Sequence, residues 1–551
     1  MPKPIIYQLL PRLWGNPVEH PAAGGSIVEN GTGKFSGIDS VTLDYLKDLG
    51  VTHVWYTGIL RHATRCHEAG CEASSADWVK GEAGSPYAIT DYFDVNPYLA
   101  EDPGHRMEEF EALVARTHAA GLKVLIDFVP NHLARDYGRF APAGKDGRDA
   151  HGHPVFGALD DPAFHWKADN DFFYYPGQAL RLPRHVSPEP YQEFPAKASG
   201  NCFSAAPGEN DWYDTIKLNY CDFPTPTWNK MLEVILFWAS KGVDGFRCDM
   251  VELVPQAFCT WLIQRAKKQY PQLVFVAEVY QKNLYDSYIH ECGFDWLYDK
   301  SGLYDALWDI VHKNVDDSGV PIEQWQSTRR ITWNWQFLGD LQPRMLNFLE
   351  NHDEPRFASD FFGKRAENAL AALHVSLLLN TAPFMLYFGQ EIGERGMDEE
   401  GMSGRDGRTS IFDWWSPASL RRLYRHIHGV PSLLPEEERL LGQYRSLLRQ
   451  ANEDPAFSLG TTYDLCYCNL SADGFNQDRH FVFLRNAGMQ VRLVACNFSD
   501  RDADLAVTIP QHAFEWMQLP QLPQLNPSVP IHVHVPAMNG IIVALLGIND
   551  Q

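Results

Sequence analysis

The chain has 551 residues, with 70 acidic and 47 basic side chains and therefore a formal net charge of −23. A negative field of this size repels polyanions and anionic lipid surfaces, so we expect no nucleic-acid partner and no membrane partner. Hydrophobic residues make up 45% and charged residues 21% of the chain, which excludes disordered and fibrous classes.

The N-terminal residues 1–8 lack the basic start and the long apolar stretch of a secretory signal. The most apolar region, residues 371–389, is interrupted by His374, Asn380 and Pro383, so it is too polar to span a bilayer. Ten cysteines in a chain of this length do not indicate a disulfide scaffold. We therefore expect a cytoplasmic protein, or one whose signal has been removed, and the oligomeric state is left open.

Apolar strand-like runs alternate with helical patterns up to about residue 450, which is typical of βα units around a parallel sheet. The runs are Ile5–Leu9, Thr52–Tyr56, Lys123–Phe128, Gly245–Cys248, Leu273–Ala277, Phe294–Leu297, Met345–Leu349 and Phe384–Phe388. Eight such runs predict a closed barrel. Between them, an apolar stripe from Met107 to Val114 predicts a helix that ends before Gly121, and Thr225-Pro226 begins another that ends at Gly242.

Residues 131–222 break this rhythm, because they are rich in Gly, Pro, Asp and aromatic residues and show no helical period. The segment is too long for a loop, so we expect a small inserted domain after the third strand. Beyond Asn452, short alternating segments predict an antiparallel β-sandwich. They are Tyr463–Asn469, His480–Arg485, Val491–Phe498, Leu505–Ile509, Ile531–Val535 and Ile541–Leu546.

The predicted fold class is thus α/β. Residues 1–130 and 223–453 are expected to form a (β/α)8 TIM barrel, which residues 131–222 interrupt as the inserted domain. Residues 454–551 are expected to form the C-terminal β-sandwich.

Acidic residues close four of the predicted barrel strands. They are Asp127, Asp249, Glu278 and Asp353. Chemistry in a parallel barrel gathers at the carboxyl ends of the strands, so barrel closure would bring these acids together. One acid at a strand end is equally explained by a helix cap or an ion pair, whereas four indicate a site.

Arg247 strengthens the case for a site. Residues i and i+2 of a strand point to the same side, so its guanidinium can pair with Asp249 and favour the ionised carboxylate. One ionised and one protonated carboxyl group held close together are what retaining glycoside hydrolysis requires. The acids therefore predict a glycosidase site.

At these residues the sequence resembles the α-amylase superfamily, glycoside hydrolase family 13. Four segments are similar to the signature regions of that family, in the family's order: Asp127–His132, Gly245–Asp249, Phe275–Glu278 and Phe348–Asp353. Residues 383–393 also resemble the segment that follows the last barrel strand of the family.

The resemblance implies roles for seven residues. Asp249 would be the nucleophile, Glu278 the acid/base, and Asp353 the acid that orients and stabilises the distorted sugar. Arg247 would pair with the nucleophile, His132 and His352 would bind sugar hydroxyls, and Tyr87 would stack on the same sugar. Packing in the core is the alternative for Tyr87 and the histidines, and it is the default for other aromatics expected near this face: Trp78, Trp212, Tyr213, Trp333 and Trp335.

Three positions depart from the family. Ala88 stands where sucrose-handling relatives and α-glucosidases carry Asp, which suggests an open non-reducing end and endo-type cleavage. Met250-Val251-Glu252-Leu253 replaces a segment that carries Lys-His in many α-amylases, so the acceptor side is atypical. Lys217 stands where many relatives carry a calcium-binding Asp, and Asn131 matches the other half of that site. We expect this calcium site to be missing, and a metal at another site is left open. The chemistry requires no organic cofactor.

The leading hypothesis is retaining hydrolysis of α-1,4-glucosidic bonds in starch- or glycogen-type α-glucans and maltooligosaccharides. An α-glucan transglycosidase, such as a 4-α-glucanotransferase or a maltosyltransferase, is the alternative because it uses the same covalent intermediate. A third hypothesis is a non-catalytic glycan-binding relative, against which the presence of all three acids argues.

Overall fold

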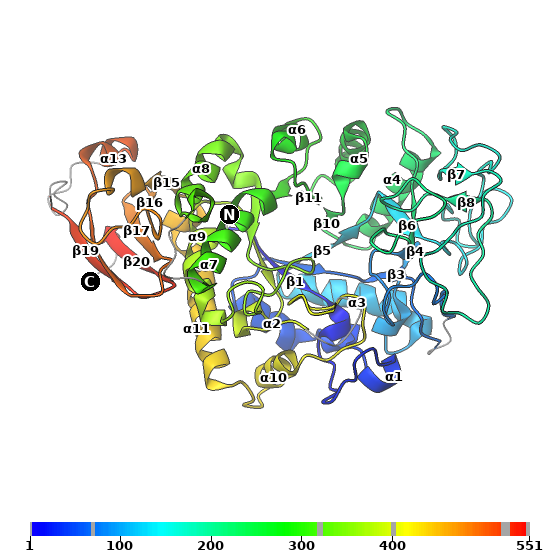
Figure 1. The fold of residues 1–551 in the computed structure, drawn as a ribbon, viewed down its shortest axis with the longest axis horizontal. Coiled ribbons are helices and arrows are strands. Elements are labelled where there is room, and N and C mark those ends of the chain that lie inside the picture. Colours follow the sequence, from blue (N-terminus) through cyan, green and yellow to red (C-terminus); the bar gives the residue numbers. More distant parts are fainter. Residues whose placement is uncertain (1–2, 68–71, 317–322, 398–403, 520–528, 547–551) are drawn as a thin grey trace.

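The computed structural model describes residues 3–67, 72–316, 323–397, 404–519 and 529–546. Within these residues, eight parallel strands close into a barrel in the order β1-β14-β13-β12-β11-β10-β5-β2 (Figure 1). They are β1 (Ile5–Leu9), β2 (His53–Tyr56), β5 (Lys123–Phe128), β10 (Gly245–Cys248), β11 (Val274–Ala277), β12 (Trp296–Tyr298), β13 (Met345–Phe348) and β14 (Phe384–Tyr387). The eight predicted runs are these strands, and no end differs by more than two residues.

The barrel strands are apolar because both of their faces are covered. Every residue of β1, β2, β10, β13 and β14 is buried, as expected for parallel strands between a packed interior and a layer of helices. The parallel register pairs Arg247 with Asp127 on β5 and with Val276 on β11. Residues that follow these strands therefore emerge at the same end of the barrel.

Most of the helices surround the barrel, and the last of them packs with the C-terminal strands (Figure 1). Their bounds are α1 (Ile27–Asn30), α2 (Ser40–Asp48), α3 (Arg106–Ala119), α4 (Pro226–Ser240), α5 (Gln256–Gln269), α6 (Tyr285–His290), α7 (Asp305–Asp316), α8 (Arg329–Leu338), α9 (Ala369–Leu378), α10 (Ala418–Ile427), α11 (Pro435–Glu453), α12 (Pro455–Ser458) and α13 (Gln511–Trp516). Helices α3 and α4 are the two predicted from apolar stripes. Among the described residues, every helix is too short or too polar to cross a lipid bilayer.

The segment between β5 and α4 is mostly irregular. Its short strands pair as β6 (His132–Ala134) with β9 (Thr215–Lys217) and β7 (Tyr174–Tyr175) with β8 (Ala196–Lys197). A second excursion, which the sequence patterns did not reveal, follows β2 and contains the antiparallel pair β3 (Leu60–His62) and β4 (Ile89–Val95). Both excursions lie at one end of the molecule, far from the C-terminal strands (Figure 1).

The C-terminal strands are antiparallel, as predicted. Sheet β15-β16-β17-β20 comprises Thr461–Asp464, His480–Ala487, Gln490–Asn497 and Asn539–Leu546, and β18 (Ala503–Val507) pairs with β19 (Ile531–Val535). Residues of both sheets share one apolar core that includes Val482, Leu493, Leu505 and Val533. The strand predicted over 463–469 is displaced: β15 ends at Asp464, and a 3-10 helix follows at Cys466–Cys468. The Asp464 carboxylate accepts the Cys466 backbone N–H at 2.7 Å.

Candidate active site

Three carboxyl groups converge on one guanidinium at the carboxyl end of the barrel. Arg247 Nη1 lies 2.6 Å from Asp249 Oδ1, and its Nη2 lies 2.9 Å from Glu278 Oε2 and 3.9 Å from Asp353 Oδ2. The Arg247 side chain is 1% exposed, so these ion pairs form in a region of low dielectric constant. The structure therefore brings together the three acids that the sequence placed on separate strands.

The backbone beyond the strands fixes two of the acids. The ladder of hydrogen bonds continues past the strand ends, because Asp249 N–H donates to Phe128 O at 2.8 Å and Glu278 N–H donates to Cys248 O at 3.2 Å. Met250 follows with a φ of 45°, a left-handed conformation that is strained for a residue with a side chain. This turn aims the Met250 N–H at Glu278 Oε2, 2.9 Å away. The strained residue thus links the segment of Asp249 to the carboxyl group of Glu278.

Burial and charge oppose each other at these groups. Burial raises the pKa of Asp249, and the Arg247 guanidinium opposes this rise while the neighbouring Glu278 adds to it. Burial alone would lower the pKa of Arg247, but Glu278 and Asp249 hold it well above its usual range. Arg247 therefore stays charged and compensates the negative charge of the cluster.

Tyr87 and His352 form a second group beside the acids. Their rings stack with centroids 5.3 Å apart, and the Tyr87 hydroxyl lies 2.5 Å from His352 Nε2. Burial lowers the pKa of His352 well below its usual range, so the ring is neutral. The Gln8 amide donates to Nδ1 at 2.8 Å, which leaves the proton on Nε2, 3.1 Å from Asp353 Oδ2. His352 is thus held in one tautomer beside Asp353.

Asp127 lies beneath Tyr87 and does not line the cavity. The Tyr87 hydroxyl donates to Asp127 Oδ1 at 3.3 Å, and the Gly58 N–H donates to Oδ2 at 3.2 Å. Burial raises the pKa of Asp127 to about 6, although Arg247 opposes the shift. Asp127 therefore supports the position of Tyr87.

His132, on β6, also lines the cavity. Burial lowers its pKa to about 3, and nearby Lys217 adds to the shift, so this ring is also neutral. The Asn131 amide donates to Nδ1 at 3.1 Å, so Nε2 carries the proton. Trp212 packs against the ring with centroids 5.2 Å apart. A neutral imidazole with a fixed tautomer suits a hydroxyl-bearing ligand.

These groups surround a cavity of about 250 Å³. It is lined by Lys80, Ser85, Tyr87, His132, Trp212, Asp214, Thr215, Asp249, Met250, Glu278, Tyr280, His352, Asp353, Ile411 and Phe412. Of the predicted residues, Arg247 lies behind the wall, and the other six line the cavity. Sequence reasoning missed Lys80, Asp214, Tyr280 and Phe412. Tyr280 carried a signal, because it is two residues from Glu278, to whose Oε1 its hydroxyl donates at 2.5 Å.

The remaining predicted aromatics divide between the cavity and packing positions. Trp212 lines the cavity, whereas Trp78 and Tyr213 are buried in a small apolar cluster. Trp333 lies in a different groove, against Tyr467 of the C-terminal segment, and Trp335 packs against the main core. Ala88 is 2% exposed in the same cluster as Trp78, so its side chain does not form part of the cavity wall.

Lys217 occupies the place where the resemblance implies calcium. Its ammonium contacts Asn131 Oδ1 and lies 3.0 Å from the Leu253 carbonyl oxygen. Both partners are neutral oxygens. Burial lowers the pKa of Lys217 to about 8. Calcium prefers six to eight oxygen ligands including carboxylates, so a set of one amide, one carbonyl and one ammonium does not fit it.

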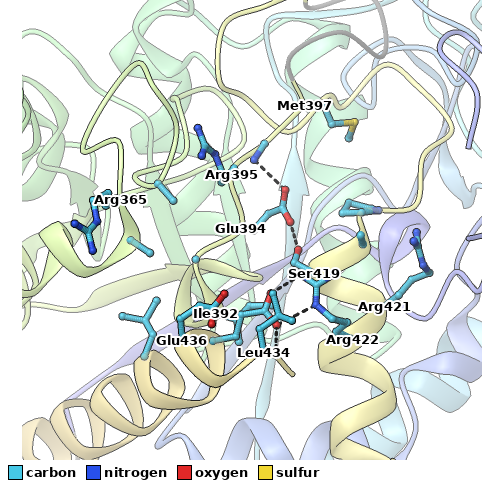
Figure 2. A pocket seen from close by; sticks show the side chains of 18 of the residues that line it. Arg365, Ile392, Glu394, Arg395, Met397, Ser419, Arg421, Arg422, Leu434 and Glu436 are labelled. Carbon is cyan, nitrogen blue, oxygen red and sulfur yellow. Dashed lines mark hydrogen bonds and ion pairs between the residues drawn. The ribbon is translucent and has the colours of Figure 1, made fainter. Parts of the chain in front are cut away.

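A second, larger cavity of about 610 Å³ shares no lining residue with the cavity that contains the three acids. Figure 2 shows Glu394 in this cavity, where it accepts hydrogen bonds from Ser419 Oγ and from Gly396 N–H at 2.9 Å. Arg422 pairs with Glu437, and Arg395 lies 2.9 Å from Asp360. These charged groups are therefore already paired within the protein.

Comparisons with known proteins show the family to which the chain belongs. A family model described as "Alpha amylase, catalytic domain" matches residues 25–416. The chain is 26% identical over 376 residues to the α-amylase MalA of Haloarcula japonica, covering 66% of this chain and 42% of that protein. It is 23% identical over 517 residues to a cyclomaltodextrinase of Geobacillus thermopakistaniensis, covering 92% of this chain and 70% of that protein.

The chain thus spans less than half of the haloarchaeal relative. Among solved structures, the α-amylase of Geobacillus thermoleovorans complexed with acarbose has a similar fold, with a TM-score of 0.62, 18% identity and 99% of each chain covered. The family model covers most of the barrel, including all three acids. On this match, the chain belongs to the α-amylase family, glycoside hydrolase family 13.

Proposed function

We propose that this protein hydrolyses α-1,4-glucosidic bonds in maltooligosaccharides and starch- or glycogen-type α-glucans, with retention of configuration. The observation that carries the proposal is the contact of one buried guanidinium with Asp249, Glu278 and Asp353. Retaining hydrolysis needs two carboxyl groups close together, and a third negative charge stabilises the oxocarbenium-like transition state. The arrangement supplies all three in one cavity.

Asp249 acts as the nucleophile in this proposal. Its carboxylate oxygen bonds to the anomeric carbon while the glucosidic C–O bond breaks, and Glu278 gives its proton to the departing oxygen. Water then attacks the anomeric carbon, Glu278 takes a proton from that water, and the bond to Asp249 breaks. Tyr280 and the Met250 N–H hold the two oxygens of Glu278 at the cavity wall.

The other residues bind the sugar. The Tyr87 ring offers an apolar face to the pyranose, and its stacking on His352 fixes its angle. His132 and His352 line the cavity as neutral imidazoles, which suits contact with sugar hydroxyls. The Nε2–H of His352 faces the Tyr87 hydroxyl and Asp353, so it orients these two groups toward the sugar. Asp353, whose side chain is 39% exposed, lines the cavity and can accept hydrogen bonds from sugar hydroxyls.

The proposed reaction requires no cofactor and no calcium. Lys217 supports this, because its ammonium contacts Asn131, which matches the other half of the calcium site in the resemblance. No step of the mechanism passes through a metal ion.

The experiment is time-resolved product analysis on maltoheptaose and soluble starch, with EDTA present. Hydrolysis predicts shorter maltooligosaccharides, new reducing ends in matching number, and rates unchanged by EDTA. Asp249→Asn should lower the rate about 10⁴-fold or more, since it removes the nucleophile. Asp340→Asn, the same change at an exposed acid, is the matched control.

Two results would contradict the proposal. Products both longer and shorter than maltoheptaose, without a matching rise in reducing ends, would identify a transglycosidase. Binding of maltoheptaose without turnover in the parent protein would identify the non-catalytic alternative.

A further inference from the structure

We infer that the cavity is closed on the donor side, the side that holds the part of the substrate that stays bonded to Asp249. The enzyme therefore releases short products of one length from the non-reducing end of α-glucan chains. The inference rests on the proposed function. Its basis is a wall formed by two loops, whose residues Gly81, Ala83, Ser85, Ile411 and Phe412 we call the donor-side wall.

The barrel order decides which end of the cavity this wall occupies. Glu278 follows β11 and protonates the leaving oxygen in the proposed mechanism, so the leaving group departs on the side of β11. In the closed order, β11 is four strands from β1 in either direction, so β1 is directly opposite. The two loops follow β2 and β14, which are the neighbours of β1. The wall therefore lies on the side of the sugar that stays attached to Asp249.

The two loops are joined by a backbone contact. Ala83 N–H donates to Phe412 O at 2.9 Å. Gly81 has a φ of +68°, and a Cβ added there would lie 2.2 Å from Phe412 O, so only glycine permits this approach. Ser85, Ile411 and Phe412 line the cavity directly. The join thus stands at the edge of the cavity and leaves no gap between the loops at this point.

The wall is also anchored to the barrel. Buried Arg12 donates to Ile411 O at 2.8 Å. Asn30 donates to Trp414 O at 2.7 Å, and Asn16 donates to Trp415 O at 2.9 Å. Three side chains from the N-terminal segment therefore fix the backbone of the second loop, so the substrate meets a fixed wall.

This wall replaces the sequence expectation of an open end. That expectation depended on the absence of an Asp at position 88, and Ala88 indeed lies buried beside Trp78, outside the cavity wall. The residues of the donor-side wall, not position 88, close this end. The retained part of the substrate carries the non-reducing end, because its anomeric carbon is bonded to Asp249. A closed donor side admits only a chain end, so it predicts exo-type action in place of the endo-type action expected from the sequence.

The test compares maltoheptaose with maltoheptaose whose non-reducing glucose is blocked by an ethylidene group. The parent enzyme should cleave the free substrate to one short product of constant length. It should cleave the blocked substrate at least about tenfold more slowly, which is the effect of one steric clash in a pocket. The ratio of kcat/KM for the blocked substrate to kcat/KM for the free substrate should rise about tenfold in Phe412→Ala, which widens the cavity, and in Gly81→Ala, which separates the two loops.

Gly429→Ala is the matched control for Gly81→Ala. Gly429 also has a positive φ, +85°, but an added Cβ there meets nothing within 4 Å. It carries the same backbone strain and should leave the blocked-to-free ratio unchanged.

The outcomes separate the two proposals. Equal cleavage of blocked and free substrate by the parent enzyme, with products of mixed length from the start, would overturn the inference and leave the proposed hydrolysis standing. Absence of cleavage of either substrate would overturn the proposed function and the inference with it.

Discussion

Arg247 shows why the acids had to be predicted as a set. Its partners Asp249, Glu278 and Asp353 follow three different strands, and only the closed barrel places them around one guanidinium. Their positions at strand ends are visible in the sequence, because each follows a run of apolar residues. The contacts of Lys80 and Phe412 with the cavity are not visible there, since both residues lie in loops without periodicity.

Tyr87 allows a test of how the sugar-binding wall is held. Tyr87→Phe keeps the ring that stacks on His352 but removes the hydroxyl that joins His352 to Asp127. We expect kcat/KM for maltoheptaose to fall about tenfold, the value of one or two buried hydrogen bonds, with unchanged binding of the apolar face. Tyr87→Ala should cause a larger loss. Equal losses in the two variants would show that the hydroxyl, not the ring, makes the contribution.

At the scale of elements, the pairing of β6 with β9 places Lys217 directly opposite His132. This pairing brings the ammonium to Asn131 and to the Leu253 carbonyl, which follows the strained turn at Met250. The replacement at position 217 could be recognised from the resemblance. The neutral partners of Lys217 could not be predicted, because they depend on how the irregular segment between β5 and α4 folds back onto the barrel.

Lys217 should make stability depend on pH in an unusual window. Burial lowers its pKa from 10.5 to about 8, so the unfolded chain binds more protons than the folded chain between these values. Burial of the charged ammonium therefore lowers the free energy of unfolding in full below pH 8, and this loss disappears as the pH rises toward 10.5. Relative to Lys217→Met, the free energy of unfolding of the parent protein should rise by about 3 kcal/mol across this window.

The measurement is chemical denaturation of both proteins at pH 7.5 and pH 10. A stability difference that is the same at both values would mean that Lys217 does not titrate in this range, and that its ammonium is better solvated than its burial indicates.

At the scale of the whole molecule, α9 joins the barrel to the C-terminal sheet. All ten of its residues are buried, because one face packs on the barrel and the other on β17 and β20. The main core accordingly runs from Ile5 of the barrel to Phe483 and Val494 of the sheet. The strands of the barrel and of the C-terminal sheet could be predicted from their periodicity. The apolar sequence of α9 predicts that this helix is buried, but it does not predict that the helix lies between the barrel and the sheet.

A substitution at Gly540 of β20 would disturb the contact between this strand and α9. A Cβ added there would lie 2.5 Å from His374 Cγ of α9, so Gly540→Ala should wedge the sheet away from the helix and cost about 1–3 kcal/mol. We expect one thermal transition at a lower temperature, and an unchanged kcat/KM at 25 °C because the cavity is remote. Gly442→Ala is the control: it lies in α11 with nothing within 4 Å, so the better helix former should not destabilise. Separate transitions for barrel and sheet would refute a shared core.

If Asp249 forms a covalent bond to the sugar, the anomeric configuration of the first product must reveal it. Proton NMR during the first seconds of maltoheptaose cleavage, before mutarotation, resolves the two anomers at the new reducing end. Two displacements at the anomeric carbon predict the α-anomer. Initial release of the β-anomer would mean a single displacement by water, and it would contradict the role assigned to Asp249.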